Sequence, residues 1–298
     1  MSLRVDPNII PDILAGLNTT RQQLNTADLQ LASGRTINQP SDNPAGTAAL
    51  VLNHVAQSQN DTFQSNVSTL QTSESTADSA LNSAENVIDQ AISLGVQAGD
   101  SNLSDQQRAA IATQLQGIQQ QLISIANTNV GGSYLFAGTD TQTAPFVADG
   151  ASPAGVDYVG NEEVASVELN NNQSVNVNVP GDQLFLNPSG SLLGSLNQLI
   201  TAVQTNTNIQ GASTALGTAA TEFTTQRLTY GSVLNQLQSA STLLNNQEVQ
   251  LQTQEQSLSG ADLATVETNF SQAQIAYTSL LDAESHILTL PTLLSLLA

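Results

Sequence analysis

The sequence predicts a mainly α-helical protein: an elongated antiparallel helical rod or coiled coil formed by both chain ends, with a small antiparallel β module inserted between them. Three observations predict this fold. Large apolar residues recur at every seventh position in the C-terminal half, similar stripes occur elsewhere, and between residues 131 and 190 the apolar period falls to two. A sustained heptad indicates helices that bury a seam, and a period of two indicates strands.

The longest apolar stripe predicts a single long helix in the C-terminal half. At about 1.5 Å of rise per residue this helix extends roughly 65 Å, far beyond an ordinary globular helix. The interleaved heptad positions are mixed and include Arg227, Glu248 and Glu255. This mixture favours a bundle with a partly wet flank over an even two-stranded seam. The apolar positions are Leu216, Phe223, Tyr230, Leu237, Leu244, Leu251 and Leu258.

A first helix near the N-terminus and a last helix near the C-terminus each carry one apolar face. Gly34 is expected to end the first helix as a C-terminal cap, and Pro291 to end the last. We expect both faces to be exposed in a single chain and buried between neighbouring subunits of an assembly. The residues of this predicted assembly surface are Ile10, Leu14, Leu17, Leu24, Leu31, Leu263, Val266, Phe270, Tyr277, Leu280 and Ile287.

Two further helices are predicted between the first helix and the β module. One has apolar residues at steps of three and four from Phe63 to Ala91, and Glu74 is the one charged residue on its stripe. The other begins after Ser104, whose hydroxyl can cap the helix while Gln107 reaches back to form a capping box. With the helices above, the sequence therefore predicts five long amphipathic helices that flank the β module.

The segment between Gly131 and Gly190 is typical of short antiparallel strands joined by tight turns. Val175, Val177 and Val179 alternate with asparagine, and Gly, Pro and Asn punctuate the segment. Acidic residues are dense here and could hold Ca²⁺, but no regular Asp-x-Asp-x-Asp-Gly loop occurs. A solvated outer surface is therefore the favoured interpretation. The acidic residues are Asp140, Asp149, Asp157, Glu162, Glu163 and Glu168.

Composition excludes several classes of function. The formal net charge is −20, which opposes binding to phosphate backbones and to anionic lipid surfaces, so neither nucleic acid nor membrane is an expected partner. Cysteine is absent, and no stretch has the roughly 18 apolar residues that membrane insertion requires. The N-terminus lacks the apolar core of a cleavable signal. A cytoplasmic protein and a protein exported unfolded without such a signal both fit these features.

No catalytic, metal-binding or cofactor-binding constellation stands out in the sequence. His54 and His286 lie in different helical stretches without a metal-ligand spacing, and both are interpreted as ordinary helix residues. Gly131 and Gly132 precede a strand rather than a helix, which does not suit a phosphate cradle. We therefore predict no enzyme activity and no cofactor.

Residues 31–46, LASGRTINQPSDNPAG, form the most specific motif in the chain. Local physics explains it as a helix stop at Gly34, an extended turn at Gln39–Pro40, and a new helix capped by Asn43 with Pro44 at its first position. The same letters closely resemble the N-terminal motif of the flagellin family. The matching residues are Gly34, Arg35, Asn38, Pro40, Ser41, Asp42, Asn43, Pro44 and Ala45.

Two further segments support the resemblance, which covers about residues 5–146 and 191–298. Residues 103–139 are similar to the segment that ends the family's second rod helix, and residues 132–146, GSYLFAGTDTQTAPF, are especially similar to its junction subunits. The run from residue 261 to the C-terminus resembles the closing helix of the family. The start, MSLRVDPNII, departs from the usual family pattern, so the register of the first residues is not set by the resemblance.

The resemblance implies a structural subunit of the bacterial flagellum with three domains. Residues 1–44 with 262–298 would form a terminal coiled-coil domain, residues 45–133 with 191–261 a helical rod domain, and residues 134–190 a small variable β domain. It further implies an extracellular protein at the hook–filament junction, exported by the flagellar type III pathway without a cleaved signal. The implied partners are identical subunits in a ring, another hook-associated junction protein, flagellin and a flagellar export chaperone.

Two alternative functions remain at this stage. A flagellin, the filament subunit itself, has the same helical motifs, but its usual pattern after the second helix is less like this chain. An enzyme or small-molecule binding module belongs to a different class and would need a nucleophile or metal motif that the sequence lacks.

Overall fold

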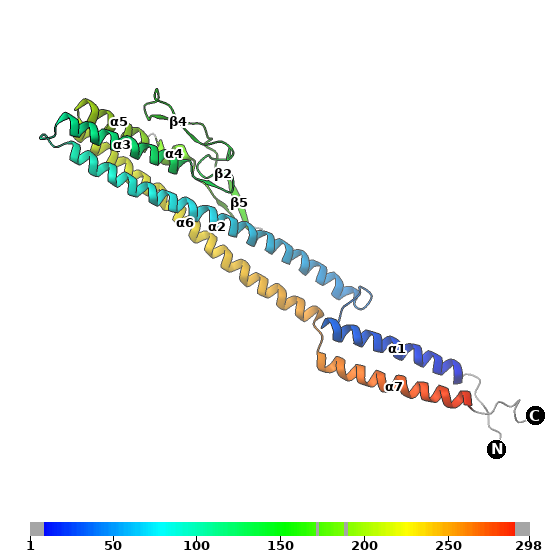
Figure 1. Cartoon of the computed structure of the whole chain (residues 1–298). Helices are drawn as coiled ribbons and strands as arrows, with labels where there is room; N and C mark the ends of the chain where they lie inside the picture. Colours follow the sequence, from blue (N-terminus) through cyan, green and yellow to red (C-terminus); the bar gives the residue numbers. More distant parts are fainter. Residues whose placement is uncertain (1–8, 171–172, 188–189, 290–298) are drawn as a thin grey trace, which may run out of the picture. The chain divides into compact units, whose positions relative to one another are not determined.

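The computed structural model describes residues 9–170, 173–187 and 190–289, and the predicted mainly helical fold is confirmed (Figure 1). The chain divides into two compact units. Unit 1 contains Met1–Gln59 with Glu248–Ala298, and unit 2 contains Asn60–Gln247. The division into three domains remains a prediction. The helices are α1 (Ile9–Ser33), α2 (Pro44–Ala98), α3 (Asp105–Ala126), α4 (Gly181–Phe185), α5 (Leu192–Thr205), α6 (Ile209–Ser259) and α7 (Leu263–Thr289).

In unit 1 the helix nearest the N-terminus pairs with the helix nearest the C-terminus. Helices α1 and α7 contact each other along their lengths and bury small side chains between them (Figure 1). Ala27, Val266 and Ala273 are each buried, and the Thr20 hydroxyl is satisfied by the carbonyl of Gly16 at 2.8 Å. Small residues let the two backbones approach closely, so this pair has a thin core.

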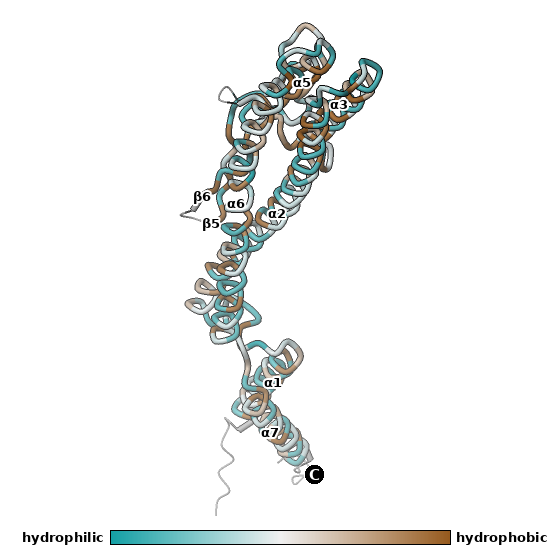
Figure 2. Tube along the Cα trace, turned by 90° about the vertical axis from the view of Figure 1, so that its left-hand side faces the viewer, coloured by the Kyte–Doolittle hydropathy of each residue, from teal (hydrophilic) through white to brown (hydrophobic). Residues whose placement is uncertain are grey.

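Unit 2 holds the main hydrophobic core, which lies between α3, α5 and the described parts of α2 and α6 that belong to this unit. The long heptad predicted as one helix is continuous in α6, and its residues Leu216, Phe223, Tyr230, Leu237 and Leu244 are all buried. Figure 2 shows hydrophobic residues recurring along α3 and α5, as expected for helices with one buried face. The predicted capping box at Ser104 is present at the start of α3.

The β segment contains three antiparallel two-stranded sheets instead of one continuous sheet. Its strands are β1 (Asn129–Val130), β2 (Ser133–Tyr134), β3 (Phe146–Ala148), β4 (Val156–Tyr158), β5 (Ser166–Asn170) and β6 (Gln173–Asn176). They pair as β1–β2, β3–β4 and β5–β6. The prediction of short antiparallel strands is confirmed, but the alternating valines extend further than the strand. Val177 and Val179 lie beyond β6, because the Asn178 side chain there accepts from the Ala165 N–H at 2.6 Å and donates to the Glu163 carbonyl at 3.1 Å.

The expectation that the β segment is a solvated outer surface holds for only one of its faces. Leu169 and Val175 of the β5–β6 hairpin are buried with Val67 of α2 and Leu237 of α6. An aromatic cluster formed by Phe136, Phe146, Phe185, Phe223 and Tyr230 joins the segment to the helices, with ring centroids 5.3–6.4 Å apart in the pairs that link these rings. The hairpins therefore contribute to the core of unit 2, while their acidic side chains face outward.

Candidate assembly surface

The motif at residues 34–44 forms the connection between α1 and α2 in unit 1. Gly34 has a φ of +68°, a left-handed conformation that favours glycine, and its N–H donates to the Gln30 carbonyl at 2.9 Å. The Asp42 N–H donates to the Gln39 carbonyl at 3.0 Å, which closes a turn around Pro40. The predicted helix stop and turn are therefore both present.

Asp42 and Asn43 hold this connection through side-chain oxygens that accept from the backbone. One carboxylate oxygen of Asp42 accepts from the N–H groups of Asn38 and Gln39 at 2.9 and 2.8 Å. The Asn43 side chain accepts from the Gly46 N–H at 2.9 Å and so caps α2, as predicted. A Cβ at Gly46 would lie 2.6 Å from the end of the Ile37 side chain and close to the capping Asn43 side chain, so both would have to shift to accommodate a larger residue.

The α1–α2 connection is bound to the α6–α7 connection. Arg35 forms an antiparallel bridge with Gly260, and the Thr36 N–H donates to the Ser259 carbonyl at 2.6 Å. The Ala261 N–H donates in return to the Gly34 carbonyl at 2.9 Å. These backbone bonds join segments more than 200 residues apart, so the motif holds the two chain ends of unit 1 in one register.

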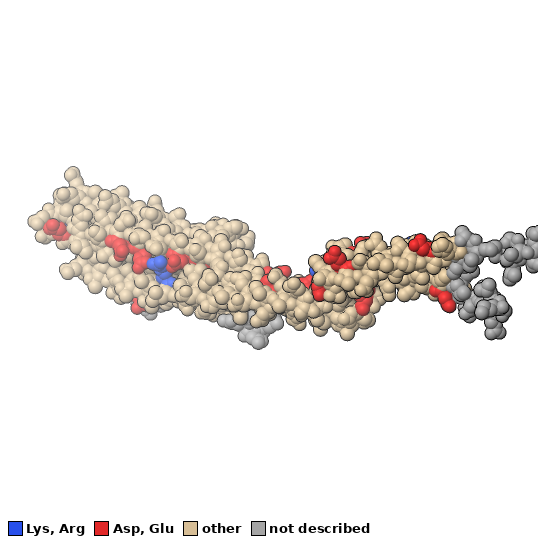
Figure 3. Space-filling view, turned by 90° about the horizontal axis from the view of Figure 1, so that it is seen from below, with Lys and Arg blue, Asp and Glu red and all other residues tan. Residues whose placement is uncertain are grey.

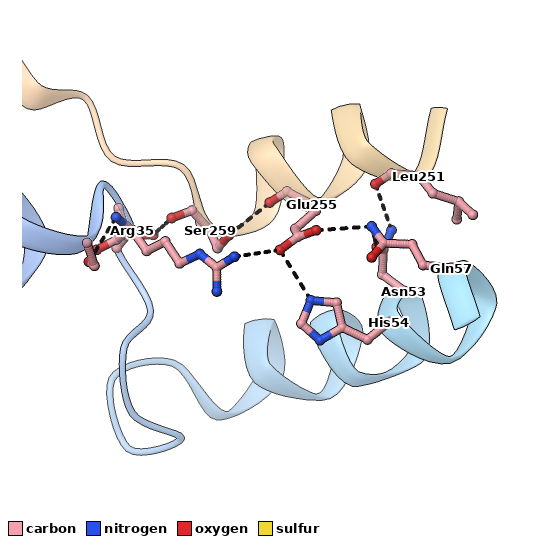
Figure 4. A network of polar contacts seen from close by, with 9 residues as sticks. Arg35, Asn53, His54, Gln57, Leu251, Glu255 and Ser259 are labelled. Carbon is pink, nitrogen blue, oxygen red and sulfur yellow. Dashed lines mark hydrogen bonds and ion pairs between the residues drawn. The ribbon is translucent and has the colours of Figure 1, made fainter. Parts of the chain in front are cut away.

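Glu255 of α6 is the centre of a polar network beside this bridge (Figure 4). Its carboxylate accepts from Gln57 at 3.0 Å and from Arg35 at 3.0 Å, and His54 Nε2 lies 3.2 Å away. The hydrogen bond from Gln57 is the largest cause that lowers the pKa of Glu255, followed by the contact with His54. In the same network the buried Asn53 donates to the Leu251 carbonyl at 3.1 Å.

Sequence reasoning found the motif but missed its partners. The motif side chains from Asn38 to Pro44 are exposed, whereas the side chains of Arg35 and Thr36 reach across to Glu255 and to the Ser259 carbonyl. The heptad pattern predicts a wet flank at Glu255 but not its partners, and it predicts no role for His54 beyond that of a helix residue. One feature of the sequence could have indicated the network: polar residues occupy successive heptad positions of α6. At such positions two paired helices form side-chain hydrogen bonds instead of apolar contacts.

The two predicted apolar stripes lie against each other, which corrects the expectation that a single chain leaves both exposed. Val266 is buried, and the members that are half-buried are Leu17, Leu24, Leu31, Phe270, Tyr277 and Leu280. Leu14 and Leu263 stay 48 % and 52 % exposed. The side chains of Ile10 and Ile287 lie outside the described part of the structure. Stripes at the two chain ends complement each other because α1 and α7 pair within one chain.

Other large apolar side chains on unit 1 are exposed and were not predicted. Leu29 on α1 and Ile275 and Leu281 on α7 are 48 %, 65 % and 41 % exposed. On α2, Val51, Leu52 and Val55 are at least half exposed. Large apolar side chains exposed on helix surfaces are found where proteins bind other proteins. A groove of about 650 Å³ also lies between α1 and α7, and its lining is mainly Gln, Thr and Asn side chains.

The described residues contain no arrangement that resembles a metal centre. No group of three or more His, Cys, Asp or Glu side chains in residues 9–170, 173–187 and 190–289 could hold an ion. The acidic residues of the β segment do not converge on one point. None of the helices in this part of the chain combines the length and apolar character of a membrane span.

Charge is sparse on the face of the molecule drawn in Figure 3, where most atoms belong to uncharged residues. In unit 2, Arg227 of α6 bridges two carboxylates of α2, lying 2.9 Å from Asp78 and 2.6 Å from Glu85. Hydrogen bonding to Asp78 is the largest cause that raises the pKa of Arg227. This ion-pair group joins the two long helices and has the geometry of a structural clamp.

The helical pairing, the motif and the surface of exposed apolar residues define a subunit of the flagellin type. The bacterial flagellin N-terminal helical region matches residues 12–141, and the C-terminal helical region of the same family matches residues 213–297. Together these regions include well over half of the chain, and the protein belongs to the bacterial flagellin family.

Individual members of the family are similar to this chain over most of its length. The chain is 28 % identical over 266 residues to flagellar hook-associated protein 3 of Escherichia coli K12, covering 80 % of this chain and 81 % of that protein. A putative flagellar hook-associated protein from Vibrio parahaemolyticus has a similar structure, with a TM-score of 0.66 at 19 % identity over 73 % of this chain and 99 % of that one. The structure of the flagellar junction protein FlgL of Legionella pneumophila is also similar, with a TM-score of 0.57 at 15 % sequence identity. The match covers 71 % of this chain and 99 % of that one.

Proposed function

We propose that this protein is a structural subunit of the bacterial flagellum that forms part of the junction between hook and filament. The observation that carries the proposal is the identity to flagellar hook-associated protein 3, which extends over about four fifths of both chains. The similarity of residues 132–146 to junction subunits supports the same assignment. A structural role also agrees with a fold built from long paired helices.

The physical basis of assembly is the apolar surface that unit 1 leaves uncovered. We propose that neighbouring copies in a ring bury Leu14, Leu29, Leu263, Ile275 and Leu281. Each large side chain that is fully buried at such an interface contributes about 1.5–3 kcal/mol. Because a ring repeats the same contact at each subunit, a small change in this surface is multiplied over the assembly.

The proposed partners are another hook-associated junction protein on the hook side and flagellin on the filament side. Export through the flagellar type III pathway, with a flagellar chaperone before export, is part of the same proposal. An assembled subunit would then lie outside the cell, at the boundary of the two structures. The motif at residues 34–44, which holds the chain ends in register, would set the geometry of the surface that meets these partners.

Immunogold labelling of isolated flagella tests this assignment. A junction subunit gives one band at the boundary between hook and filament, and a strain that lacks it sheds flagellin into the medium. Label along the whole filament would instead assign the protein as a flagellin. The control for cross-reaction is to probe with the same antibody the flagellin that the deletion strain sheds into its medium.

A further inference from the structure

A cavity of about 210 Å³ lies in unit 2 between the β5–β6 hairpin and the two long helices. Glu74 of α2 lines it from one side and Tyr230 of α6 from another, and both residues are buried. Asn176, Gln183 and Thr229 also line it and are exposed, so they mark its mouth. At about 30 Å³ per water molecule, the cavity has room for a small organic molecule.

Two polar groups in this cavity are poorly satisfied by the protein. Glu74 is only 3 % exposed, and no hydrogen bond or ion pair joins its carboxyl group to another described residue. The Tyr230 hydroxyl reaches the backbone N–H and carbonyl of Val179 only at 3.4 Å. Buried polar groups are nearly always hydrogen-bonded, so such groups beside a cavity indicate a missing partner.

The surroundings favour a cation as that partner. Arg227, on the same helix as Tyr230, is committed to Asp78 and Glu85 and is not available to Glu74. In the part of the chain that the structure describes, the cavity lining contains no Lys or Arg side chain. The formal charge of −20 on the whole chain also attracts cations to the protein.

The lining groups suit an N–H donor better than a metal ion. Ca²⁺ takes six to eight oxygen ligands, usually with several carboxylates, whereas among the described residues Glu74 is the one carboxylate that lines this cavity. A carboxylate and a phenol oxygen can both accept from an ammonium or guanidinium group, and such charge-assisted hydrogen bonds are short and strong. Amide side chains at the mouth can accept from the remaining N–H groups.

We propose that this cavity binds a small organic cation with an N–H-donating head group, a primary ammonium or a guanidinium, through the carboxylate of Glu74 and the hydroxyl of Tyr230. The bound cation would supply the partner that Glu74 lacks and add a donor to Tyr230, whose bonds to Val179 are long. It would also connect α2, α6 and the segment that follows β6, so binding should tighten the hairpin on the helices.

Proton linkage gives the proposal a characteristic pH dependence. Burial raises the pKa of Glu74 from 4.5 to about 8, so the carboxyl is mostly protonated at neutral pH. The cation binds the ionised form and releases a proton. Its affinity should therefore rise about tenfold between pH 6 and pH 7 and level off above pH 8. Tyr230 does not contribute to this change, because burial and the nearby Glu74 raise its pKa further above the normal value.

The experiment is a calorimetric titration of the full chain with methylguanidinium and methylammonium chloride at pH 6, 7, 8 and 9. Tetramethylammonium and sodium chloride at equal ionic strength provide cations without N–H donors. Glu74→Gln is the test variant, since glutamine mimics the protonated carboxyl and should keep the fold. Glu168→Gln removes the same charge from an exposed position on β5 and serves as its matched control. Amide hydrogen exchange of residues 173–179 measures whether the cation stabilises the hairpin.

We expect the wild-type chain to bind an N–H-donating cation saturably at pH 8. The affinity for this cation should be at least tenfold lower in Glu74→Gln and unchanged in Glu168→Gln. The wild-type chain should bind tetramethylammonium at least tenfold more weakly. Amides of the hairpin should exchange more slowly in the presence of the cation. Absence of saturable binding by the wild-type chain at pH 8 and 9, equal binding by Glu74→Gln, or an affinity independent of pH would overturn the proposal. The cavity would then hold only water beside a protonated carboxyl group.

Discussion

Leu280 of α7 packs directly over Gly16 of α1. A methyl group added at Gly16 would lie 3.4 Å from one terminal carbon of Leu280 and 3.6 Å from the other, so the two helices touch at this point. Leu281, the next residue, is 41 % exposed and lies away from this contact. Adjacent leucines on α7 therefore have different environments, which separates pairing within the chain from assembly between chains.

Leu280→Asp and Leu281→Asp test this separation. An aspartate at position 280 places a charge against α1, and its desolvation should separate the helix pair. The same charge at position 281 remains in water in the isolated chain but opposes burial between subunits. We expect faster amide exchange of α1 and α7 for Leu280→Asp only, and loss of a stable junction for both. Fast exchange of both helices in the wild-type chain would mean that the pair forms only on assembly.

If a Leu281→Asp strain has wild-type filaments, Leu281 is not part of the assembly surface. Normal export of both variants, measured as protein in the culture medium, is the control that separates assembly from secretion.

Glu255→Gln should loosen the connection formed by the flagellin motif. The variant keeps the shape of the side chain but loses the charge that Arg35 and His54 contact, so we expect a loss of about 1 kcal/mol of stability at neutral pH. Because the folded-state pKa of Glu255 is lowered, its contribution is present above the unfolded value of 4.5 and disappears as the pH falls through the folded pKa.

The measurement for Glu255→Gln is urea unfolding at pH 7 and pH 3.5, together with amide exchange of residues 34–43. Glu267→Gln removes an exposed carboxylate from α7 and is the matched control. A stability difference that is the same at both pH values would contradict an electrostatic role for Glu255.

Arg227→Met should destabilise unit 2 more than Arg108→Met. Arg227 pairs with two carboxylates on another helix, while Arg108 pairs only with the exposed Asp105 three residues earlier on its own helix. Since Asp78 and Glu85 are about one-third exposed, we expect a loss of only about 1–2 kcal/mol. The urea midpoint should fall for Arg227→Met and stay unchanged for Arg108→Met, and equal midpoints would show that the clamp contributes nothing.

Leu169→Ala should reveal how far the β5–β6 hairpin supports the helices. Leu169 is fully buried against the helices of unit 2, so the substitution should cost about 2–4 kcal/mol. Leu228 of α6 is 71 % exposed, and the same change there should cost less than about 0.5 kcal/mol. Thermal unfolding of both variants is the measurement. A small effect at Leu169 would mean that the hairpin is indeed an outer addition that the unit does not need.

The sequence by itself determined the five long helices, several of their caps and the family, but α4 and α5 were not predicted. Pro291, expected to end the last helix, lies outside the described residues. The heptad from Leu216 onward, the glycine cap at Gly34 and the capping box at Ser104 depend on contacts within a few residues, or on a repeat along one helix. Such patterns are local, so they can be recognised without knowing what the helix packs against.

Only the tertiary structure decided which faces are covered and which polar groups meet. The stripes of α1 and α7 bury each other, Glu255 gathers side chains from about 200 residues away, and Glu74 lies unpaired beside a cavity. Each of these depends on the rotation and register with which distant segments pair. A stripe of apolar residues predicts that a face is buried, but the physical identity of its partner is set by long-range packing, which no local pattern contains.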